Sequence, residues 1–422
     1  MADRRYRVLA LCTNPVQYMS PVFRRMVQRA ELDLSVAYCR LRGAEPGYDP
    51  EFATTVKWDT PLLEGFPWRE LANRGSGGES FFGVWNPSVW SLIRDGAFDA
   101  VLCFTGYRCA TFWIAWLAAK SSRTVFLFGT DATTLVSRDP RPWKRWAKAL
   151  FWPRLYALAD QVIVPSSGSR DLMVSLGIPE ERVTLTPYSV DNEWWMAESA
   201  KVDRSAVRAA WGVSASDAVV LFCAKLQPWK RPLDLLHAFA KAKVSNAHLV
   251  YAGEGPLRGQ LQAEAKRLGV PQQVRFLGFV NQTQLPAVYT ASDLMVLPSE
   301  YEPFAVVVNE AICCGCPVIA SDRVGASRDL VAPVAPKLVY PCGDVDALAA
   351  VLRSALSDRA QLDSIAAAAR EHIRTWSSKE NIDATIDAVR TAVSRIRQLP
   401  RRPAAVGPTA PSSAAGPQKL PE

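Results

Sequence analysis

The sequence predicts an α/β protein made of two doubly wound, Rossmann-like domains that face each other across a central cleft. Short apolar runs alternate with helical stretches along most of the chain, which is typical of parallel sheets covered on both faces. This alternation breaks once, at 191–218, where the sequence becomes polar and charged. A chain of 422 residues is also too long for one ordinary core, so two domains are expected.

The first domain is assigned to 1–195. Helices are expected from Ser20, with Pro21 in the first turn, and in two later stretches, 109–120 and 169–176. The predicted strands are 7–12, 32–38, 99–104, 124–128, 161–165 and 183–187. Asn14 follows the first of these strands and Asp131 follows the fourth. Since ligands of open parallel sheets bind at the carboxyl ends of the strands, both side chains are expected to face the cleft.

The second domain is assigned to 196–397. The predicted strands are 218–223, 248–252, 274–277, 294–298, 318–321 and 338–340. Helices are expected over 232–242, 257–268 and 285–291, from 345, and through 364–396, with the last helix a candidate to cross back to the first domain. Residues 398–422 are rich in Pro and Ala without apolar periodicity, which predicts a disordered tail.

One stretch of the second domain, Pro298 to Asp322, holds two carboxylates eight positions apart, Glu302 and Glu310. If the stretch were helical throughout, they would lie about 12 Å apart, roughly the length of a sugar nucleotide from ribose to sugar ring. Two cations, Lys225 and Lys230, follow the first strand of this domain and precede a helix, a setting that suits a diphosphate. Together these residues predict a site for a nucleoside-diphosphate sugar.

These residues belong to a longer series of motifs in a fixed order. The series is Lys225-Leu-x-x-x-Lys230, AGEGP at 252–256, VRFLGFV at 274–280, ASDLMVLPS at 291–299, Glu302-x7-Glu310 and GCPVIASD at 315–322. In this series the second domain resembles the nucleotide-binding half of the family-four (group 1) retaining glycosyltransferases. The first domain resembles that family more loosely, at 159–173 and 186–195. The resemblance implies the two-domain GT-B fold.

The resemblance also implies roles for individual residues. Lys225 and Lys230 would hold the donor diphosphate and stabilise the departing nucleoside diphosphate. Glu310 would accept hydrogen bonds from the ribose hydroxyls, and Glu302 would bind hydroxyls of the transferred sugar. The remaining donor contacts would come from the backbone amides of Phe304 and Ala305, the backbone near Phe279, the turn at Gly253 and Glu254, and the strand-end residue Asn14. The nucleoside-diphosphate sugar is expected as the substrate, with no cofactor and no metal.

The sequence departs from the family at two positions where glycine is usual, Arg231 and Ala305. The family commonly places a histidine of the first domain near the reacting centre, but here all three histidines lie in the second half. Asp131 is the nearest polar candidate, and it would orient the acceptor hydroxyl or stabilise oxocarbenium charge. The alternative interpretation is a turn or helix-capping aspartate.

Composition excludes other classes. The net charge is +8, but half of the excess lies in 395–422, which argues against nucleic acid as a partner. The nine cysteines mostly fall in apolar runs and are interpreted as buried thiols in a reducing cytosol, not as a zinc site. The first residues lack the apolar core of a signal peptide, so a cytoplasmic protein is expected.

The segment 141–160 predicts contact with a membrane surface. Trp143, Trp146 and Leu150 fall at helical spacing with lysines and arginines between them, a combination that favours an anionic lipid interface. Many enzymes that resemble this chain act on lipid-linked acceptors, which agrees with this hypothesis. The alternative is a domain helix with buried aromatic residues and a solvated basic face.

The expected reaction is metal-independent, retaining transfer of a sugar to a saccharide or lipid-linked acceptor, in cell-surface polysaccharide or glycolipid synthesis. No enzyme nucleophile is evident, which favours a front-face route. A sugar-nucleotide epimerase or hydrolase on the same fold is one alternative, although both need acid–base groups around the sugar. A catalytically silent binding subunit of an assembly complex is another, although it would be expected to have lost site residues.

Overall fold

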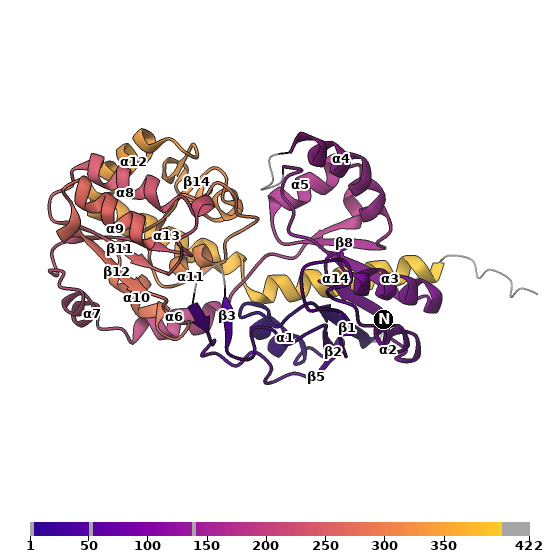
Figure 1. The fold of residues 1–422 in the computed structure, drawn as a ribbon. Helices are drawn as coiled ribbons and strands as arrows, with labels where there is room; N and C mark the ends of the chain where they lie inside the picture. Colours follow the sequence, from indigo (N-terminus) through magenta and orange to yellow (C-terminus); the bar gives the residue numbers. More distant parts are fainter. Residues whose placement is uncertain (1–3, 50–53, 137–140, 399–422) are drawn as a thin grey trace, which may run out of the picture.

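The computed structural model describes residues 4–49, 54–136 and 141–398. The predicted tail therefore lies outside the described residues, apart from its first residue. The described chain forms two lobes, each a parallel sheet with helices on both faces (Figure 1). The predicted fold class, α/β with two Rossmann-like domains, is confirmed.

The first lobe holds a parallel sheet of seven strands in the order β5-β2-β1-β6-β7-β8-β9. The strand order reverses beside β1, and a reversal of this kind opens a crevice at the carboxyl ends of the strands. The strands are β1 Tyr6–Cys12, β2 Leu32–Tyr38, β5 Trp68–Glu70, β6 Ala100–Cys103, β7 Val125–Gly129, β8 Gln161–Val164 and β9 Val183–Leu185. The helices are α1 Met19–Met26, α2 Val89–Asp95, α3 Ala110–Ser122, α4 Pro142–Ala157 and α5 Ser167–Ser175.

The second lobe holds a parallel sheet of six strands in the order β12-β11-β10-β13-β14-β15. The strands are β10 Ala218–Cys223, β11 Ala247–Ala252, β12 Val274–Gly278, β13 Leu294–Leu297, β14 Val318–Ser321 and β15 Val339–Tyr340. The helices are α7 Arg204–Ala210, α8 Pro232–Ala242, α9 Arg258–Arg267, α10 Leu285–Ala291, α11 Val307–Cys313, α12 Val345–Ser357 and α13 Arg359–His372.

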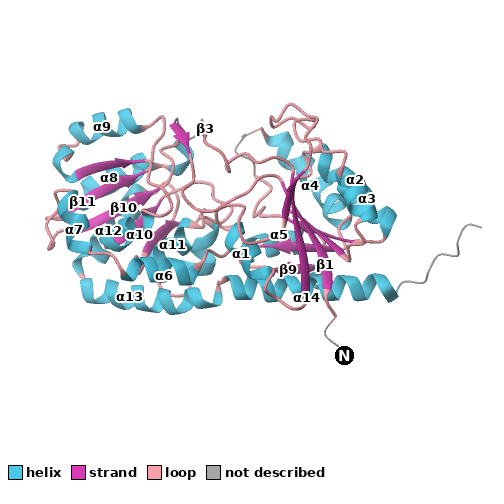
Figure 2. Ribbon diagram, turned by 90° about the horizontal axis from the view of Figure 1, so that it is seen from below, coloured by secondary structure: helices cyan, strands magenta, loops and turns pink. Residues whose placement is uncertain are grey.

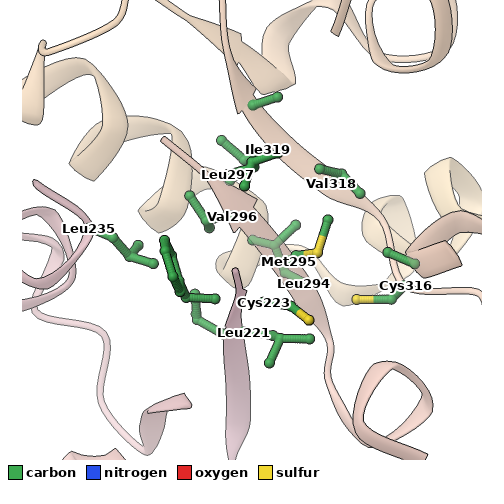
Figure 3. Close-up of a cluster of buried hydrophobic side chains, with 14 of the residues drawn as sticks. Leu221, Cys223, Leu235, Leu294, Met295, Val296, Leu297, Cys316, Val318 and Ile319 are labelled. Atoms are coloured by element: carbon green, nitrogen blue, oxygen red, sulfur yellow. The ribbon is translucent and has the colours of Figure 1, made fainter. Parts of the chain in front are cut away.

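Side chains of β10, β13 and β14 make the centre of the second core (Figure 3). Leu221, Met295 and Ile319 are fully buried there because their strands are covered on both faces. Cys223 and Cys316 lie in the same cluster as free thiols, and burial raises the pKa of both to values far from those of a reactive thiolate. These cysteines pack as small apolar side chains.

Two helices join the lobes. The first, α6 Asn192–Ala200, spans the predicted domain boundary at 195/196, and its Trp195 belongs to the second core. The second, α14 Ser378–Gln398, leaves the second lobe and runs along the first (Figure 2). Its buried residues Ile382, Ile386 and Val389 pack into the core under β1 and β2. The last described helix therefore completes the first lobe.

Some elements were not predicted. The stretch 39–98 had no assignment, yet it holds α2, β5 and an antiparallel hairpin of β3 Gly47–Asp49 and β4 Thr54–Val56. Each of these strands has three residues, too few to show an apolar alternation. The stretch from Glu302 to Glu310 is also not helical throughout, since α11 begins only at Val307. Pro303 and the positive φ of Ala305 keep the preceding residues in a loop, so the helical spacing of about 12 Å does not apply.

Candidate functional site

The strand ends of the second sheet bring Lys230 and Glu302 together. Lys230 ends the short helix Pro228–Lys230 that follows β10, and its Nζ forms an ion pair with Glu302 Oε1. The Ser299 hydroxyl donates to the same carboxylate oxygen at 3.1 Å. Both charged side chains are largely buried, and a buried ion pair of this kind depends on both partners staying in place. The two residues are far apart in the sequence, but they follow β10 and β13, which are neighbouring strands of the parallel sheet.

Lys225 contacts the opposite lobe. Its Nζ lies 3.2 Å from Oδ2 of Asp49, the last residue of β3. The hairpin of β3 and β4 therefore reaches from the first lobe to the second across the cleft (Figure 2). Each lysine that the sequence assigned to a diphosphate is paired with a carboxylate.

Glu310 lies on α11 in a different setting, with only 4% of its surface exposed. The Tyr289 hydroxyl donates to its Oε2 at 2.9 Å, and the Gln282 amide donates to Oε1 at 3.4 Å. Burial raises the pKa of this carboxyl to about 7. Glu310 lines a cavity of about 370 Å³ between the lobes, with Tyr18 and Asp59 of the first lobe on another wall.

Gly253 shapes the backbone beside Lys225. Its φ is +153°, and a Cβ at this position would lie 2.0 Å from the carbonyl oxygen of Ala224. Only glycine permits this close approach. The Gly253 N–H donates to the carbonyl of Gly278 at 2.8 Å, which fixes the backbone that leads into Phe279. The Glu254 carboxylate, in contrast, is paired with Arg258 within the same turn.

Ala305 and Arg231 adopt conformations that glycine favours, with φ of +87° and +52°. The resemblance to the family led us to expect glycine at these two positions. Both residues keep the positive φ that glycine would adopt, although each has a Cβ, so the backbone is strained there. Phe304 packs its side chain between Tyr188, at 5.5 Å between ring centroids, and Trp376, at 5.6 Å. Phe304 therefore offers only its backbone to a ligand.

A cross-cleft segment of the first lobe, residues 54–60, covers the loop after β12. Trp58 meets Phe279 edge to face, with ring centroids 5.8 Å apart. The Asn281 amide donates to the Lys57 carbonyl at 2.6 Å, and the Thr283 N–H donates to Asp59 at 3.2 Å. These contacts were not predicted, because no motif or periodicity distinguishes 54–60 from an ordinary loop.

Asp131 and Asn14 lie together at the carboxyl end of the first sheet. Both line a cavity of about 290 Å³ in the first lobe, which shares Tyr18 with the cavity of Glu310. Asn14 Oδ1 accepts a hydrogen bond from Arg40 Nε at 2.8 Å. Asp131 is exposed to the cavity, yet the surrounding protein atoms partly desolvate its carboxyl and raise its pKa. Residues 131–136 are not helical, so Asp131 does not cap a helix, while the alternative of a turn aspartate stays a prediction.

Helix α4 carries an exposed aromatic surface. Trp143 and Trp146 are 60% and 72% exposed, and Leu150 is exposed beside them. Trp152 and Tyr156, further along the helix, are buried, and the Lys148 ammonium lies 4.8 Å from the Trp152 ring centroid. The alternative of a helix with buried aromatic residues is therefore wrong for the first two turns.

The described residues, 4–49, 54–136 and 141–398, contain no group of three or more His, Cys, Asp or Glu side chains arranged to hold a metal ion. Among their helices, none combines the length and the apolar character needed to cross a bilayer.

Two family profiles match the chain. The profile described as "Glycosyl transferases group 1" matches 203–372, and the one described as "Glycosyl transferase 4-like domain" matches 1–189. An uncharacterised glycosyltransferase of Methanocaldococcus jannaschii is 32% identical over 225 residues, which are 53% of this chain and 57% of that protein. A D-inositol 3-phosphate glycosyltransferase of Geodermatophilus obscurus is 29% identical over 284 residues, which are 64% of this chain and 61% of that protein. The chain thus spans about three fifths of the length of these relatives.

Among solved structures, Anabaena HepE in complex with UDP aligns with a TM-score of 0.70 at 20% identity. The alignment covers 91% of this chain and 100% of that one. The same protein has been solved with UDP-glucose. At this identity the likeness shows the fold, two facing Rossmann-like domains in the GT-B arrangement.

Proposed function

Because the chain belongs to the group 1 glycosyltransferases, we propose that it transfers a sugar from a nucleoside diphosphate to an acceptor hydroxyl with retention of anomeric configuration. The observation that carries this proposal is the grouping of two lysines and a carboxylate at the strand ends of the second sheet. Lys230 and Glu302 are in contact there, Lys225 lies in the same loop as Lys230, and Glu310 lines the adjacent cavity.

The two lysines suit the chemistry of the leaving group. When the bond between the anomeric carbon and the diphosphate oxygen breaks, negative charge develops on that oxygen. Fixed cations in a site with little water stabilise this charge more than they stabilise the intact donor. The acceptor oxygen then bonds to the anomeric carbon from the same face, and its proton passes to the departing diphosphate oxygen. This front-face route retains configuration without an enzyme nucleophile.

Two ion pairs support an exchange of partners on donor binding. Lys225 pairs with Asp49 and Lys230 with Glu302, and the donor diphosphate takes the place of these carboxylates. Release from Lys230 leaves the Glu302 carboxylate available to accept hydrogen bonds from hydroxyls of the transferred sugar.

The roles that the family resemblance implies for the remaining residues complete the proposed donor site. Glu310 accepts from the ribose hydroxyls, and the backbone amides of Phe304 and Ala305 donate to sugar or phosphate. The loop at Phe279, held by Gly253, meets the base, while Glu254 holds the turn through Arg258 and Asn14 approaches from the first lobe. Since HepE was solved with UDP and UDP-glucose, UDP-glucose is the first donor to test here.

We propose that transfer needs no divalent metal and no cofactor, because Lys225 and Lys230 supply the positive charge that a diphosphate requires. The measurement is the transfer rate before and after exhaustive treatment with EDTA. The rate should be unchanged, and a loss that Mg²⁺ or Mn²⁺ restores would contradict this part of the proposal.

The decisive experiment combines donor binding with product analysis. Purified protein is titrated with nucleoside diphosphates, then incubated with the preferred sugar nucleotide and a panel of acceptors. NMR of the product is expected to show a new glycosidic bond with the donor's anomeric configuration. Complete conversion of donor without any acceptor would instead indicate an epimerase or hydrolase. Binding without conversion under any condition would indicate a silent binding subunit.

We propose that the enzyme is cytoplasmic and works at a membrane surface on a lipid-linked or saccharide acceptor, in polysaccharide or glycolipid synthesis. The nine free cysteines support a reducing compartment. Exposed Trp143 and Trp146 beside Lys144 and Arg145 support contact with anionic lipid.

The test of membrane contact is co-sedimentation with vesicles that contain phosphatidylglycerol. The Trp143→Ala/Trp146→Ala variant should bind several-fold more weakly, by an amount set by the lost apolar area. Trp90→Ala, which removes a partly exposed tryptophan of α2, is the matched control. Equal binding by all three proteins would refute the membrane contact at α4.

A further inference from the structure

We propose that the first-lobe cavity binds an uncharged, polyhydroxylated ring, and that this ring is the accepting unit of the transfer reaction. The acceptor would then carry no phosphate on the unit that enters the cleft. This inference rests on the proposed function, because it assigns the acceptor of that reaction. It goes further in stating which chemical class of acceptor the cavity selects.

The cavity is placed to serve the donor site. It opens at the carboxyl ends of β1, β6, β7, β8 and β9, and Tyr18 lines both this cavity and the one that holds Glu310. Tyr188 lines the other wall of the cavity, and its ring packs against the ring of Phe304, which lies in the loop before α11. The Asn309 amide of α11 also donates to the Tyr188 carbonyl at 3.0 Å. A ligand in this cavity therefore lies next to the transferred sugar.

The lining carries almost no charge. Hydroxyls and amides supply most of its polar groups, from Asn14, Tyr18, Thr130, Thr186, Tyr188 and Asn381. Asp131 is the one ionisable carboxylate among the described lining residues, and no lysine, arginine or histidine lines the cavity. A phosphate binds best to cations, so it would meet an opposing carboxylate and nothing to neutralise it.

The guanidinium of Arg40 does not change this balance. Its Nε donates to Asn14, and its Nη1 donates to the carbonyl of Gly77, outside the cavity lining. The proposed donor site differs from this cavity, because it has two cations, Lys225 and Lys230, in one loop. The chain thus places its cations where a diphosphate is expected and keeps them out of the cavity of the first lobe.

The apolar walls agree with a sugar or cyclitol ring. Phe23, Met26 and Phe104 line the same cavity as the hydroxyls and amides. A polyol ring presents C–H faces and O–H edges, and pockets of this mixed kind combine apolar walls with a few fixed polar groups. Its hydroxyls can both donate to Asp131 and accept from the tyrosines, and burial raises the pKa of Tyr18 to about 12, so that phenol remains a donor.

The experiment is calorimetry on the full chain with UDP bound. The probes are myo-inositol, methyl α-D-glucopyranoside and methyl β-D-galactopyranoside, each paired with a monophosphate of the same ring. At least one neutral probe should bind, and its phosphorylated partner should bind about ten-fold or more weakly, because nothing offsets its charge. Tighter binding of a phosphorylated partner, or no binding of any neutral probe, would overturn the inference.

UDP binding measured first separates this test from the proposed function. If the chain binds none of the nucleoside diphosphates, the proposed function fails, and the inference that depends on it fails as well. If UDP binds and a phosphorylated ring is preferred, only the inference fails.

Two variants test the residues that carry the argument. Tyr18→Phe removes the hydroxyl of a tyrosine that lines the cavity, so the neutral probe should bind about five-fold more weakly. Tyr340→Phe is the matched control, since this second-lobe tyrosine does not line the cavity. Equal losses in both variants would refute the role of the Tyr18 hydroxyl.

Met19→Lys adds a cation to the cavity wall, where Met19 is only partly buried. It should narrow or reverse the preference for the neutral ring. Thermal unfolding confirms that the variant is folded. A folded Met19→Lys variant with unchanged preference would contradict the electrostatic argument.

Discussion

The donor side and the first-lobe cavity differ in how they hold their polar groups. On the donor side, Lys225 and Lys230 are paired with carboxylates, so a ligand must exchange with partners already present. In the first-lobe cavity the polar groups are mostly neutral hydroxyls and amides. Replacing one member of an ion pair on the donor side is therefore expected to have a large effect on activity. The neutral side is expected to respond through smaller, hydrogen-bond-sized effects.

Removing a lysine should have the largest effect. Lys230→Ala takes away a cation from the leaving group and leaves Glu302 buried without its partner, so kcat/KM should fall about 10²- to 10³-fold. Steady-state transfer from UDP-glucose measures the change. Lys241→Ala, which removes an exposed lysine on α8, is the control and should stay near wild type. If Lys230→Ala also abolished binding of the neutral ring, the separation of the two sites would be wrong.

The glycine that shapes the donor turn should come next. Gly253→Ala forces a Cβ onto the Ala224 carbonyl, and the overpacking and backbone strain should lower the free energy of unfolding by about 3 kcal/mol. UDP affinity should fall with it. Gly259→Ala is the matched control, because a Cβ in this position of α9 meets nothing within 4 Å and alanine favours a helix. Unfolding in urea measures the stability of both variants. Equal stability of Gly253→Ala and Gly259→Ala would contradict the close approach of Gly253 to the Ala224 carbonyl.

The buried carboxylate should make the donor side depend on pH. The pKa of Glu310 is raised from 4.5 to about 7 in the fold, so its stabilising contribution is complete below about pH 4.5 and is lost as pH rises through about 7. Glu310→Gln should therefore gain stability over the wild type as pH rises, approaching about 3 kcal/mol at pH 8.

Unfolding free energies measured from pH 5 to 8 give the comparison for Glu310. UDP binding by the wild type should strengthen relative to Glu310→Gln over the same range, since the ionised carboxylate is the better acceptor for ribose hydroxyls. A pH-independent difference would mean that the carboxyl does not titrate in this range.

The strained loop should give the smallest change. Ala305→Gly relieves a positive φ, so it should stabilise the protein by about 1 kcal/mol and raise Tm by roughly 2–4 °C. Ala350→Gly, on an exposed position of α12, should destabilise by a similar amount. Calorimetry tests both. A loss of stability in Ala305→Gly would show that the loop is not strained at this residue.

Several features of the donor side could be predicted from the sequence because each depends on neighbouring residues. A strand, its turn and the next helix are contiguous, so Lys225 and Lys230 could be placed at a strand end from local pattern alone. The two departures from glycine were also visible, and both positions have positive φ. The helical path from Glu302 to Glu310 was wrong, because periodicity did not show that the loop continues to Val307.

The cavity of the first lobe could not be predicted in the same way. Its lining comes from separate segments, including Asn14 after β1, Tyr38 at the end of β2, Tyr188 after β9 and Asn381 on α14. Asn14 was expected at a strand end and Tyr188 lies in the loosely matching stretch 186–195, but Tyr38 and Asn381 carry no motif. Neutral side chains also give no charge pattern to follow. Asn381 reaches the cavity only because α14 crosses back to the first lobe.

The sequence by itself determined the alternation of strands and helices, the two sheets and the strand-end lysines, because these depend on short-range pattern and on which face each residue must bury. The tertiary structure decided that Lys230 meets Glu302, that Asp49 and Trp58 cross the cleft, and that Glu310 is buried enough to titrate near neutrality. These properties depend on distance and desolvation between segments far apart in the chain, which only the packing of the two lobes sets.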